Sequence, residues 1–481
     1  MWSYYRCATG PQRVNLWLLE FTNAPHYRTT DYFTTILSQM NASYFKQSYG
    51  KMWLTGSVKG WYGLGRSSSD YADLDQWGGD IPYLAGLQLA QHAEIVTGAR
   101  SIYGFRMFVF SGGSRNSGAW ADTTDGTRAV LREVHGYTTF MHELAHLLGL
   151  PDLYDYAAAS TGIAVDPTRG LDIMGDSSNE MFSSWSRMKL CWLPSDWVQE
   201  ISGPINRVTR ISLIDLDDRT SGIHVAKITW GPFNQYILLE RRGSNGYILF
   251  ADETKDSGKG ILTYNGALHS YQFAPEVALD ETHGFSAILL DNTLFKVAIA
   301  SVQVGKTARE AATILNNANV ATSRAYDDNR LQGLDEAKST LQQAYQAYSN
   351  EDFERARQLA YLAATKAGTS TTPQSYYDAT QLINLLDGQL KNATFKTKEA
   401  QSLRDQAASL YTNATVKLDF KRFDEAKTLA QQGLSLLQEA REKERVQLIV
   451  GGIQFLLPGL VAGIGISVIL FQVLRKRKRA V

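Results

Sequence analysis

The segment around His142 restricts the fold of this chain more than any other part of its 481 residues. From Thr139 to Asp152 it reads TFMHELAHLLGLPD. Its apolar residues predict a buried helix, and side chains four residues apart lie on the same side of a helix. Gly149 and Pro151 predict the end of that helix. The fold must therefore bury this helix while both histidines face a cleft.

The same spacing predicts a metal centre. The imidazoles of His142 and His146 can reach one ion, and Asp152 can bend back after the turn as a third protein ligand. The fourth position is then left to water. Glu143 lies next to the first ligand, where it can take a proton from that water and pass it to a leaving amine. We therefore expect a catalytic Zn²⁺ ion, with Glu143 as general base and then general acid.

Other residues could contribute to this centre or compete with its ligands. Met174, in the sequence LDIMGD, could form a hydrophobic floor under the metal, although such a methionine is more often ordinary core. Tyr154 or Tyr156 could donate a hydrogen bond to a developing oxyanion, with packing or a place at the rim as the alternative. Glu180 is a rival third ligand. His135, seven residues before the first histidine, lies on the same side of the helix and could support a ligand, but a surface position is the favoured interpretation.

Acidic residues also gather in a segment that precedes the motif. These carboxylates would suit a structural Ca²⁺ ion, but their spacing does not match an EF-hand loop. A solvated loop is therefore the favoured interpretation, and structural calcium is the alternative. The residues are Asp70, Asp73, Asp75 and Asp80.

Composition divides the chain into several domains. Residues 1–200 hold the motif and predict an α/β (α+β) domain. Residues 203–307 read as short alternating strands separated by turn residues, which is the pattern of an all-β, sandwich-like domain. Residues 308–445 predict a helical arm with two copies of a ~70-residue helical hairpin, in which Phe353 matches Phe423. Plain bundle packing is the favoured interpretation of this arm, and a spacer or partner-binding role is the alternative.

The C-terminal segment predicts a membrane anchor. Residues 446–474 carry no charge, and a helix needs roughly 20 apolar residues to span a bilayer. The basic residues of 475–481 predict a cytoplasmic tail, which places the catalytic domain outside the cell. No signal peptide is visible at the N-terminus, where a basic segment should precede an apolar one. We therefore expect a single-pass membrane protein whose start is assigned too late or whose leader is missing.

Charge and cysteine content exclude two further classes of protein. Forty-eight basic residues balance 48 acidic residues, so no net field draws the chain to nucleic acid. Cys7 and Cys191 cannot form a cystine framework, and nothing in the sequence pairs them. A single buried cysteine more often acts as a small apolar residue.

Several motifs in the first 200 residues resemble one known family. They are LLEFTN at 18–23, SYGKMWLTGSVKGWY at 48–62, GLPDLYD at 149–155, DIMG at 172–175 and WSRMKLCW at 185–192. Together they resemble the immune-inhibitor-A type of secreted bacterial and archaeal metalloproteases, from about residue 14 to residue 193 and more weakly to about residue 270.

The resemblance implies a metzincin-like zinc endopeptidase domain. It assigns His142, His146 and Asp152 as zinc ligands, Glu143 as the base and Met174 as the Met-turn residue. In this family a glycine is common where Cys191 stands, and an N-terminal propeptide usually holds the enzyme latent.

These observations predict a membrane-anchored zinc endopeptidase that cleaves extracellular or cell-surface proteins and peptides. Two alternatives stay open. One is a catalytically silent surface adhesin whose metal site is a relic. The other is a processing protease with a single envelope protein as its target.

Overall fold

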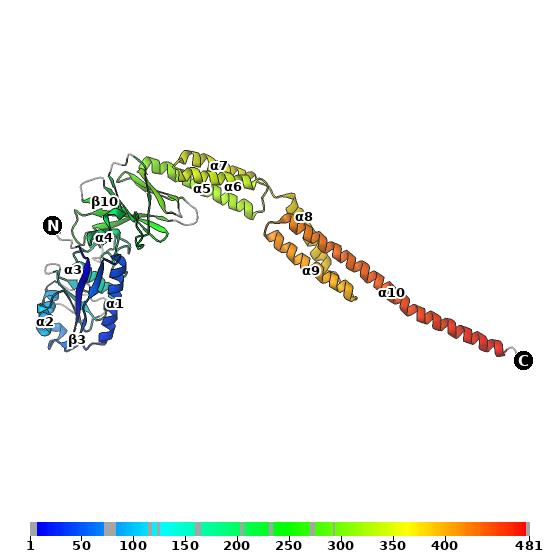
Figure 1. Ribbon diagram of the computed structural model, residues 1–481, viewed down its shortest axis with the longest axis horizontal. Coiled ribbons are helices and arrows are strands. Elements are labelled where there is room, and N and C mark those ends of the chain that lie inside the picture. The colour runs from blue at the N-terminus through cyan, green and yellow to red at the C-terminus, as the bar shows by residue number, and fades with distance from the viewer. Residues whose placement is uncertain are drawn as a thin grey trace. The chain divides into compact units, whose positions relative to one another are not determined.

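The computed structural model describes residues 7–71, 83–113, 118–122, 126–158, 165–202, 205, 207–229, 234–269, 275–291 and 294–477, with side chains up to residue 450. The described chain is a mixed α/β structure with several sheets and the helices α1 to α10 (Figure 1). Its internal contacts form two units. One comprises residues 1–316 with 346–357, and the other comprises residues 317–345 with 358–481.

A mixed sheet forms the framework of the N-terminal part. Its strands are β1 (Gly10–Glu20), β2 (Met52–Thr55), β3 (Val58–Gly63), β4 (Phe105–Phe110), β5 (Trp120–Ala121) and β6 (Arg128–Arg132). The order is β2-β1-β4-β6-β5, and β3 pairs with the second half of β1 on the same side as β2. All pairs are parallel except β5 with β6, so the sheet ends in one short antiparallel strand.

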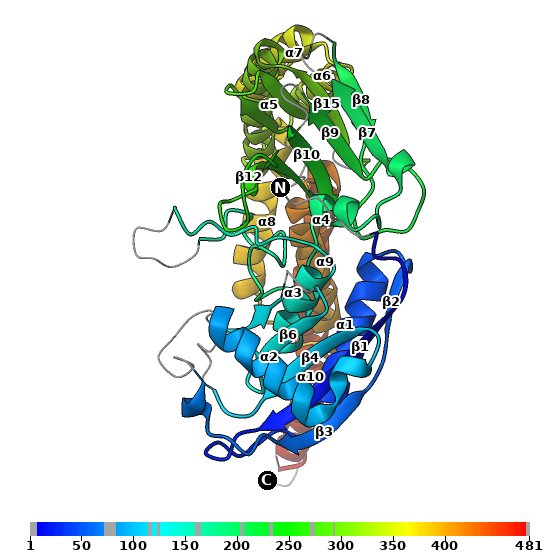
Figure 2. The ribbon, with the colours of Figure 1, turned by 90° about the vertical axis from the view of Figure 1, so that its left-hand side faces the viewer.

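Helices cover both faces of this sheet (Figure 1, Figure 2). The helices are α1 (Thr30–Gln47), α2 (Tyr83–Thr97) and α3 (Tyr137–Leu147). Alternate side chains of a strand point to opposite faces. Accordingly, Leu16 and Leu18 of β1 share a core with α1 and α3, whereas Trp17 and Leu19 share a core with α2. Because both faces are covered, β1 is buried from Val14 to Leu19.

A β domain follows the short helix α4 (Ser184–Lys189). Its strands are β7 (Val198–Ser202), β8 (Thr209–Ser212), β9 (Val225–Thr229), β10 (Gln235–Arg242), β11 (Asn245–Asp252), β12 (Leu262–His269), β13 (Val277–Asp280), β14 (Phe285–Asp291) and β15 (Lys296–Ser301). They form a five-stranded sheet, β12-β11-β10-β9-β7, and a four-stranded sheet, β13-β14-β15-β8. The two sheets enclose one apolar core.

Strand β10 joins this β domain to the N-terminal part. Ile237 and Leu239 point into the core between the two β-domain sheets. Tyr236 and Leu238 point to the other side, into the core that also contains residues of α3. The two parts are therefore packed through a continuous apolar core and belong to the same unit.

The rest of the chain is helical. Its elements are α5 (Val302–Asp327), α6 (Leu334–Ser349), α7 (Phe353–Thr369), α8 (Gln374–Lys391), α9 (Lys398–Asp419) and α10 (Phe423–Arg477). Alanines at matching positions of the two copies of the repeat are completely buried between helices. Their small side chains let the helices approach closely. These alanines are Ala337 and Ala407, Ala344 and Ala414, Ala356 and Ala426, and Ala360 and Ala430.

The prediction of a membrane-spanning helix over residues 446–474 is corrected. The described residues contain no helix with enough length and apolar character to cross a bilayer. Residues 446–474 are part of the longer helix α10. Immediately before this segment, α10 carries charged side chains such as Glu439, Arg441 and Glu442. The side chains after residue 450 lie outside the described residues. The fold class therefore loses its membrane helix. The single-pass location and the cytoplasmic tail at 475–481, which depended on that helix, are withdrawn with it.

Candidate metal centre

Helix α3 places the two histidines side by side. His142 and His146 are one turn apart, and their rings meet edge to face with centroids 4.6 Å apart. The helix ends where Gly149 adopts a φ of +105°, a conformation that favours glycine. The amide of Leu150 then donates to the carbonyl of Ala145, which is one residue further back than in a regular α-helix, and the chain reverses toward the histidines.

Backbone carbonyls fix the orientation of both imidazoles. His142 Nδ1 lies 2.8 Å from the carbonyl oxygen of Ile173, and His146 Nδ1 lies 2.8 Å from that of Leu150. A carbonyl oxygen can only accept a hydrogen bond, so each Nδ1 carries a proton and donates it. The Nε2 atoms are thereby directed to the other side of each ring, where they can bind a metal.

Asp152 completes a triangle of ligand atoms with the two Nε2 atoms. The Nε2 atoms are 3.1 Å apart, and Asp152 Oδ1 lies 3.3 Å from His142 Nε2 and 3.0 Å from His146 Nε2. Tetrahedral bonds of about 2.0–2.1 Å place neighbouring ligand atoms about 3.3 Å apart. These three residues are a candidate metal-binding group in the described part of the chain.

The environment of Asp152 fits a cation. Its Oδ1 atom is buried and lies within 3.3 Å of both imidazole Nε2 atoms, which can donate to it only when they carry a proton. Three electron-rich atoms at such distances repel one another unless a metal ion or protons lie among them. The Asp152 side chain is 21% exposed, so the group can be reached from solvent.

The charges of this group shift its pKa values strongly. Burial alone would lower the pKa of His146, but the adjacent Asp152 and Glu143 carboxylates raise the pKa to about 9. Burial also acts against charge on His142, yet Asp152 raises the pKa of His142 above its ordinary value. In turn, the two imidazoles hold the pKa of Asp152 well below its ordinary range, against the effect of burial. Without metal, the group is therefore an ion pair at neutral pH.

Glu143 lies beside the first histidine, as the motif requires. It is buried on α3, with 5% of its surface exposed. Its carboxylate is close enough to raise the pKa of both histidines. A carboxylate in this place can exchange a proton with a group held near the three ligand atoms.

Met174 lies in a buried turn that Asp172 organises. Asp172 accepts hydrogen bonds from the amide of Met174 at 2.9 Å and from the amide of Ser183 at 2.9 Å, and also from two hydroxyl groups, those of Ser183 and Ser186. Met174 itself is completely buried, and its carbonyl accepts from the amide of Leu153. The turn thus connects the segment that follows Asp152 with the segment that orients His142. Sequence reasoning missed this role of Asp172, although its place two residues before the methionine was a signal.

The remaining predicted residues occupy other surroundings. Tyr154 and Tyr156 lie in the segment after Asp152, where their rings pack edge to face with centroids 4.8 Å apart. Glu180 is not in the metal-binding group, and its carboxylate accepts a hydrogen bond of 2.9 Å from Tyr137. His135 is buried rather than at the surface, and its Nδ1 accepts from the amide of Arg132.

The acidic segment proposed for calcium is only partly described. Asp73, Asp75 and Asp80 lie outside the described residues. Asp70 accepts a hydrogen bond from the amide of Ser67 and closes a short helical turn.

The two cysteines form a disulfide, which the sequence did not predict. Cys7 and Cys191 are bonded with their Cα atoms 4.9 Å apart. Cys191 follows α4 with a φ of +60°, and the amide of Trp192 donates to the carbonyl of Arg187 to close the helix end. A left-handed conformation at the end of a helix favours glycine, and here a cysteine adopts it. The expectation of a free, apolar cysteine is therefore wrong.

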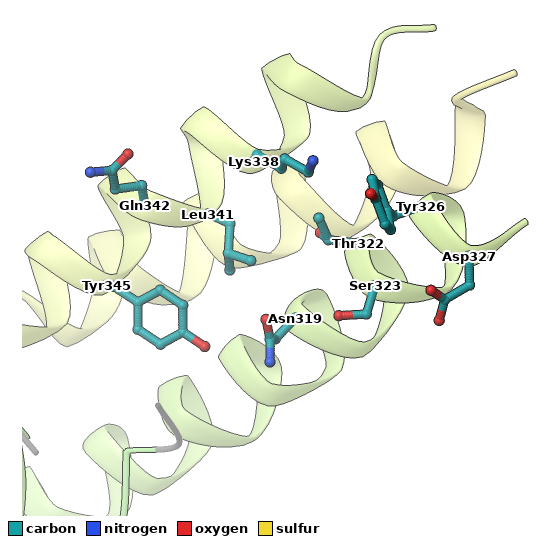
Figure 3. A pocket seen from close by; sticks show the side chains of 9 residues that line it. All are labelled: Asn319, Thr322, Ser323, Tyr326, Asp327, Lys338, Leu341, Gln342 and Tyr345. Atoms are coloured by element: carbon teal, nitrogen blue, oxygen red, sulfur yellow. The ribbon is translucent and has the colours of Figure 1, made fainter. Parts of the chain in front are cut away.

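A separate pocket of about 670 Å³ lies in the helical part of the chain. Figure 3 shows side chains of α5 and α6 that face it, including Tyr326, Lys338 and Tyr345. The pocket belongs to the second unit and contains none of the metal-centre residues. We place no step of the chemistry there.

Comparisons with known proteins add no relative. A scan against protein-family models finds no match, and a search of curated proteins finds no protein similar to this chain.

Proposed function

We propose that this protein is a zinc-dependent endopeptidase whose metal ligands are His142, His146 and Asp152. The observation that carries the proposal is the convergence of two imidazole Nε2 atoms and one buried carboxylate oxygen within 3.3 Å of one another. Two nitrogens and one oxygen form a ligand set typical of catalytic zinc, which keeps one position for water. Bound zinc would supply a polarised water at neutral pH.

The protein's own residues account for the proton transfers. Glu143 follows His142 on α3, next to the position where such a water would be held. With the metal bound, Glu143 would accept a proton from this water during attack on the peptide carbonyl and would return the proton to the leaving amine. The carbonyls of Ile173 and Leu150 keep both imidazoles in the tautomer and orientation that metal binding needs.

A peptide substrate is supported by the resemblance of the sequence to immune-inhibitor-A proteases. The motifs that carry this resemblance, among them GLPDLYD at 149–155, surround the candidate ligands. Helix α3, which carries His142, Glu143 and His146, packs against β5 and β6 of the sheet.

Cleavage of casein by the purified protein tests this function. We expect cleavage that a chelator abolishes and added zinc restores. Glu143→Gln should retain stoichiometric zinc and lose cleavage by a factor of about 100 or more, since it removes general base catalysis. Asp152→Ala should lose both zinc and cleavage, whereas Glu180→Ala, at the rival ligand position, should keep its zinc.

Three results would contradict the proposal in different ways. Stoichiometric zinc in Asp152→Ala would remove Asp152 from the ligand set. Unchanged cleavage by Glu143→Gln would remove the general base. Zinc binding without any chelator-sensitive cleavage, of either casein or a peptide library, would favour a binding protein over an enzyme.

A further inference from the structure

The segment that carries Asp152 is held by a loop of the β domain. The amide of Asp152 donates a hydrogen bond of 3.0 Å to Ser257 Oγ, and the amide of Gly258 donates to the carbonyl of Asp152 at 3.3 Å. The pairing continues along both segments, from the amide of Tyr156 to the carbonyl of Gly258 and from the amide of Gly260 to the carbonyl of Tyr154. Residues 257–260, which lie between β11 and β12, thus align with residues 152–156.

The conformation of this loop depends on two glycines. Gly258 and Gly260 have φ values of +72° and +67°, which side chains other than glycine rarely adopt. A Cβ atom at Gly260 would also lie 3.3 Å from the Asp155 carboxylate. The Gly-Lys-Gly sequence therefore lets the loop lie directly against the segment that follows the metal ligand.

A second contact from the β domain supports His142. The carbonyl that orients His142 belongs to Ile173, in the segment between Leu171 and Phe182. Arg242, at the end of β10, donates to the carbonyl oxygens at both ends of that segment, 3.2 Å from Leu171 and 3.0 Å from Phe182.

Glu240 fixes Arg242 in turn. It is completely buried, lies 2.7 Å from Arg242 Nε, and accepts a hydrogen bond of 2.7 Å from the amide of Ser184. The Glu240 carboxylate and the Arg242 guanidinium therefore form a buried ion pair beside residues 171–182, and removal of either partner would leave a buried charge unpaired.

The apolar core continues these polar contacts. Leu238 and Ile261 of the β domain lie in the same core as Leu153 and Met174, which flank the metal centre. The β domain therefore touches the centre through hydrogen bonds on two sides and through apolar contacts between them.

From these contacts we propose that the β domain is a positioning part of the metal centre. Ser257 positions the segment of Asp152, and Arg242 with Glu240 positions the carbonyl that orients His142. Metal binding and docking of the β-domain loop should then strengthen each other, because coupling between two sites is reciprocal. This inference rests on the proposed metal centre. It adds that the affinity of the centre for zinc depends on residues about 100 positions further along the chain.

The zinc dissociation constant of Ser257→Ala tests the inference, measured by competition with a chromophoric chelator. Loss of groups that orient metal ligands typically weakens metal binding by about 10–100-fold, and we expect about tenfold here. Ser257→Thr keeps the hydroxyl acceptor and should restore tight binding. Thr254→Ala is the matched control, since the Thr254 hydroxyl lies in the same loop but bonds Asp252. The control should bind zinc as the wild type does.

Two further measurements separate positioning from general damage to the fold. The visible spectrum of the Co²⁺-loaded protein should change in Ser257→Ala, because a displaced Asp152 alters the ligand field, and should be unchanged in Thr254→Ala. In the wild type, zinc should slow amide hydrogen exchange at residues 258–262.

The outcomes distinguish this inference from the proposed function. A wild-type protein that binds no zinc would overturn both. A wild type that binds zinc, together with a Ser257→Ala variant of equal affinity and an unchanged exchange rate in the loop, would overturn the role of the β domain and leave the metal centre standing.

Discussion

Zinc binding by the metal-free protein should strengthen steeply as the pH rises from 7 to 9. The Asp152 and Glu143 carboxylates outweigh burial and raise the pKa of His146 to about 9, so at pH 7 this imidazole carries a proton that zinc must displace. Two pH units below a pKa, the competition costs a factor of about 100 in affinity, or about 3 kcal/mol. We therefore expect a gain in affinity of about tenfold between pH 7 and 8, and a smaller gain as the pH approaches 9.

The stability of the metal-free protein should change in the opposite direction. A histidine whose pKa is raised on folding contributes stability that is fully present below its unfolded value of about 6.5. That contribution is lost as the pH rises through about 9. The unfolding temperature of the metal-free protein should thus fall between pH 6.5 and 9. Over the same range, the rise in unfolding temperature that saturating zinc produces should become larger.

Two measurements check this reasoning. Chelator competition at pH 6, 7, 8 and 9, corrected for protonation of the chelator, gives the slope of affinity against pH. Calorimetry in buffers with different ionisation heats counts the protons released, for which we expect at least one at pH 7. An affinity that stays constant between pH 7 and 9, with no proton released, would refute the ion pair between His146 and Asp152.

Three further perturbations test the surroundings of the centre. Asp172→Asn should lower the free energy of unfolding by about 1–3 kcal/mol, as measured by urea denaturation. The amide group of the new asparagine would face the backbone N–H of Met174, so that this buried donor would lose its acceptor. Arg187→Ala should lower the free energy of unfolding by about 3 kcal/mol or more in the same urea assay. The substitution removes a completely buried guanidinium and leaves its hydrogen-bond partners unpaired. Cys7→Ser should lower the unfolding temperature in a calorimetric scan, equivalent to about 2–4 kcal/mol, and reductant should give the wild type the same temperature.

The ligand group could be predicted from the sequence because its geometry is local. His142 and His146 are neighbours on any regular helix, and the glycine and proline that follow require a reversal of the chain. The reversal brings Asp152 back within six residues, and the structure places its Oδ1 atom 3.0 Å from His146 Nε2.

Contacts between distant segments could not be predicted in this way. Cys7 and Cys191 are 184 residues apart, and tertiary packing brings them together. The burial of His135 likewise depends on tertiary packing, whereas its sequence neighbours suggested a surface position. The membrane helix expected from the uncharged residues 446–474 is likewise not found among the described helices.

The centre therefore combines ligands that are local with supports that are not. Its three ligands and the carbonyl of Leu150 lie within eleven residues of sequence, but the other groups that orient the ligands come from Ile173 and Ser257. A peptide containing only the motif would keep the ligands and lose the carbonyl of Ile173 and the hydroxyl of Ser257. Its imidazoles would then be free to adopt either tautomer and many orientations, so its zinc affinity should be far lower than that of the folded chain. Zinc affinity therefore depends on the folding of the whole unit that contains residues 1–316 and 346–357. We expect zinc to be released when the β domain separates from α3.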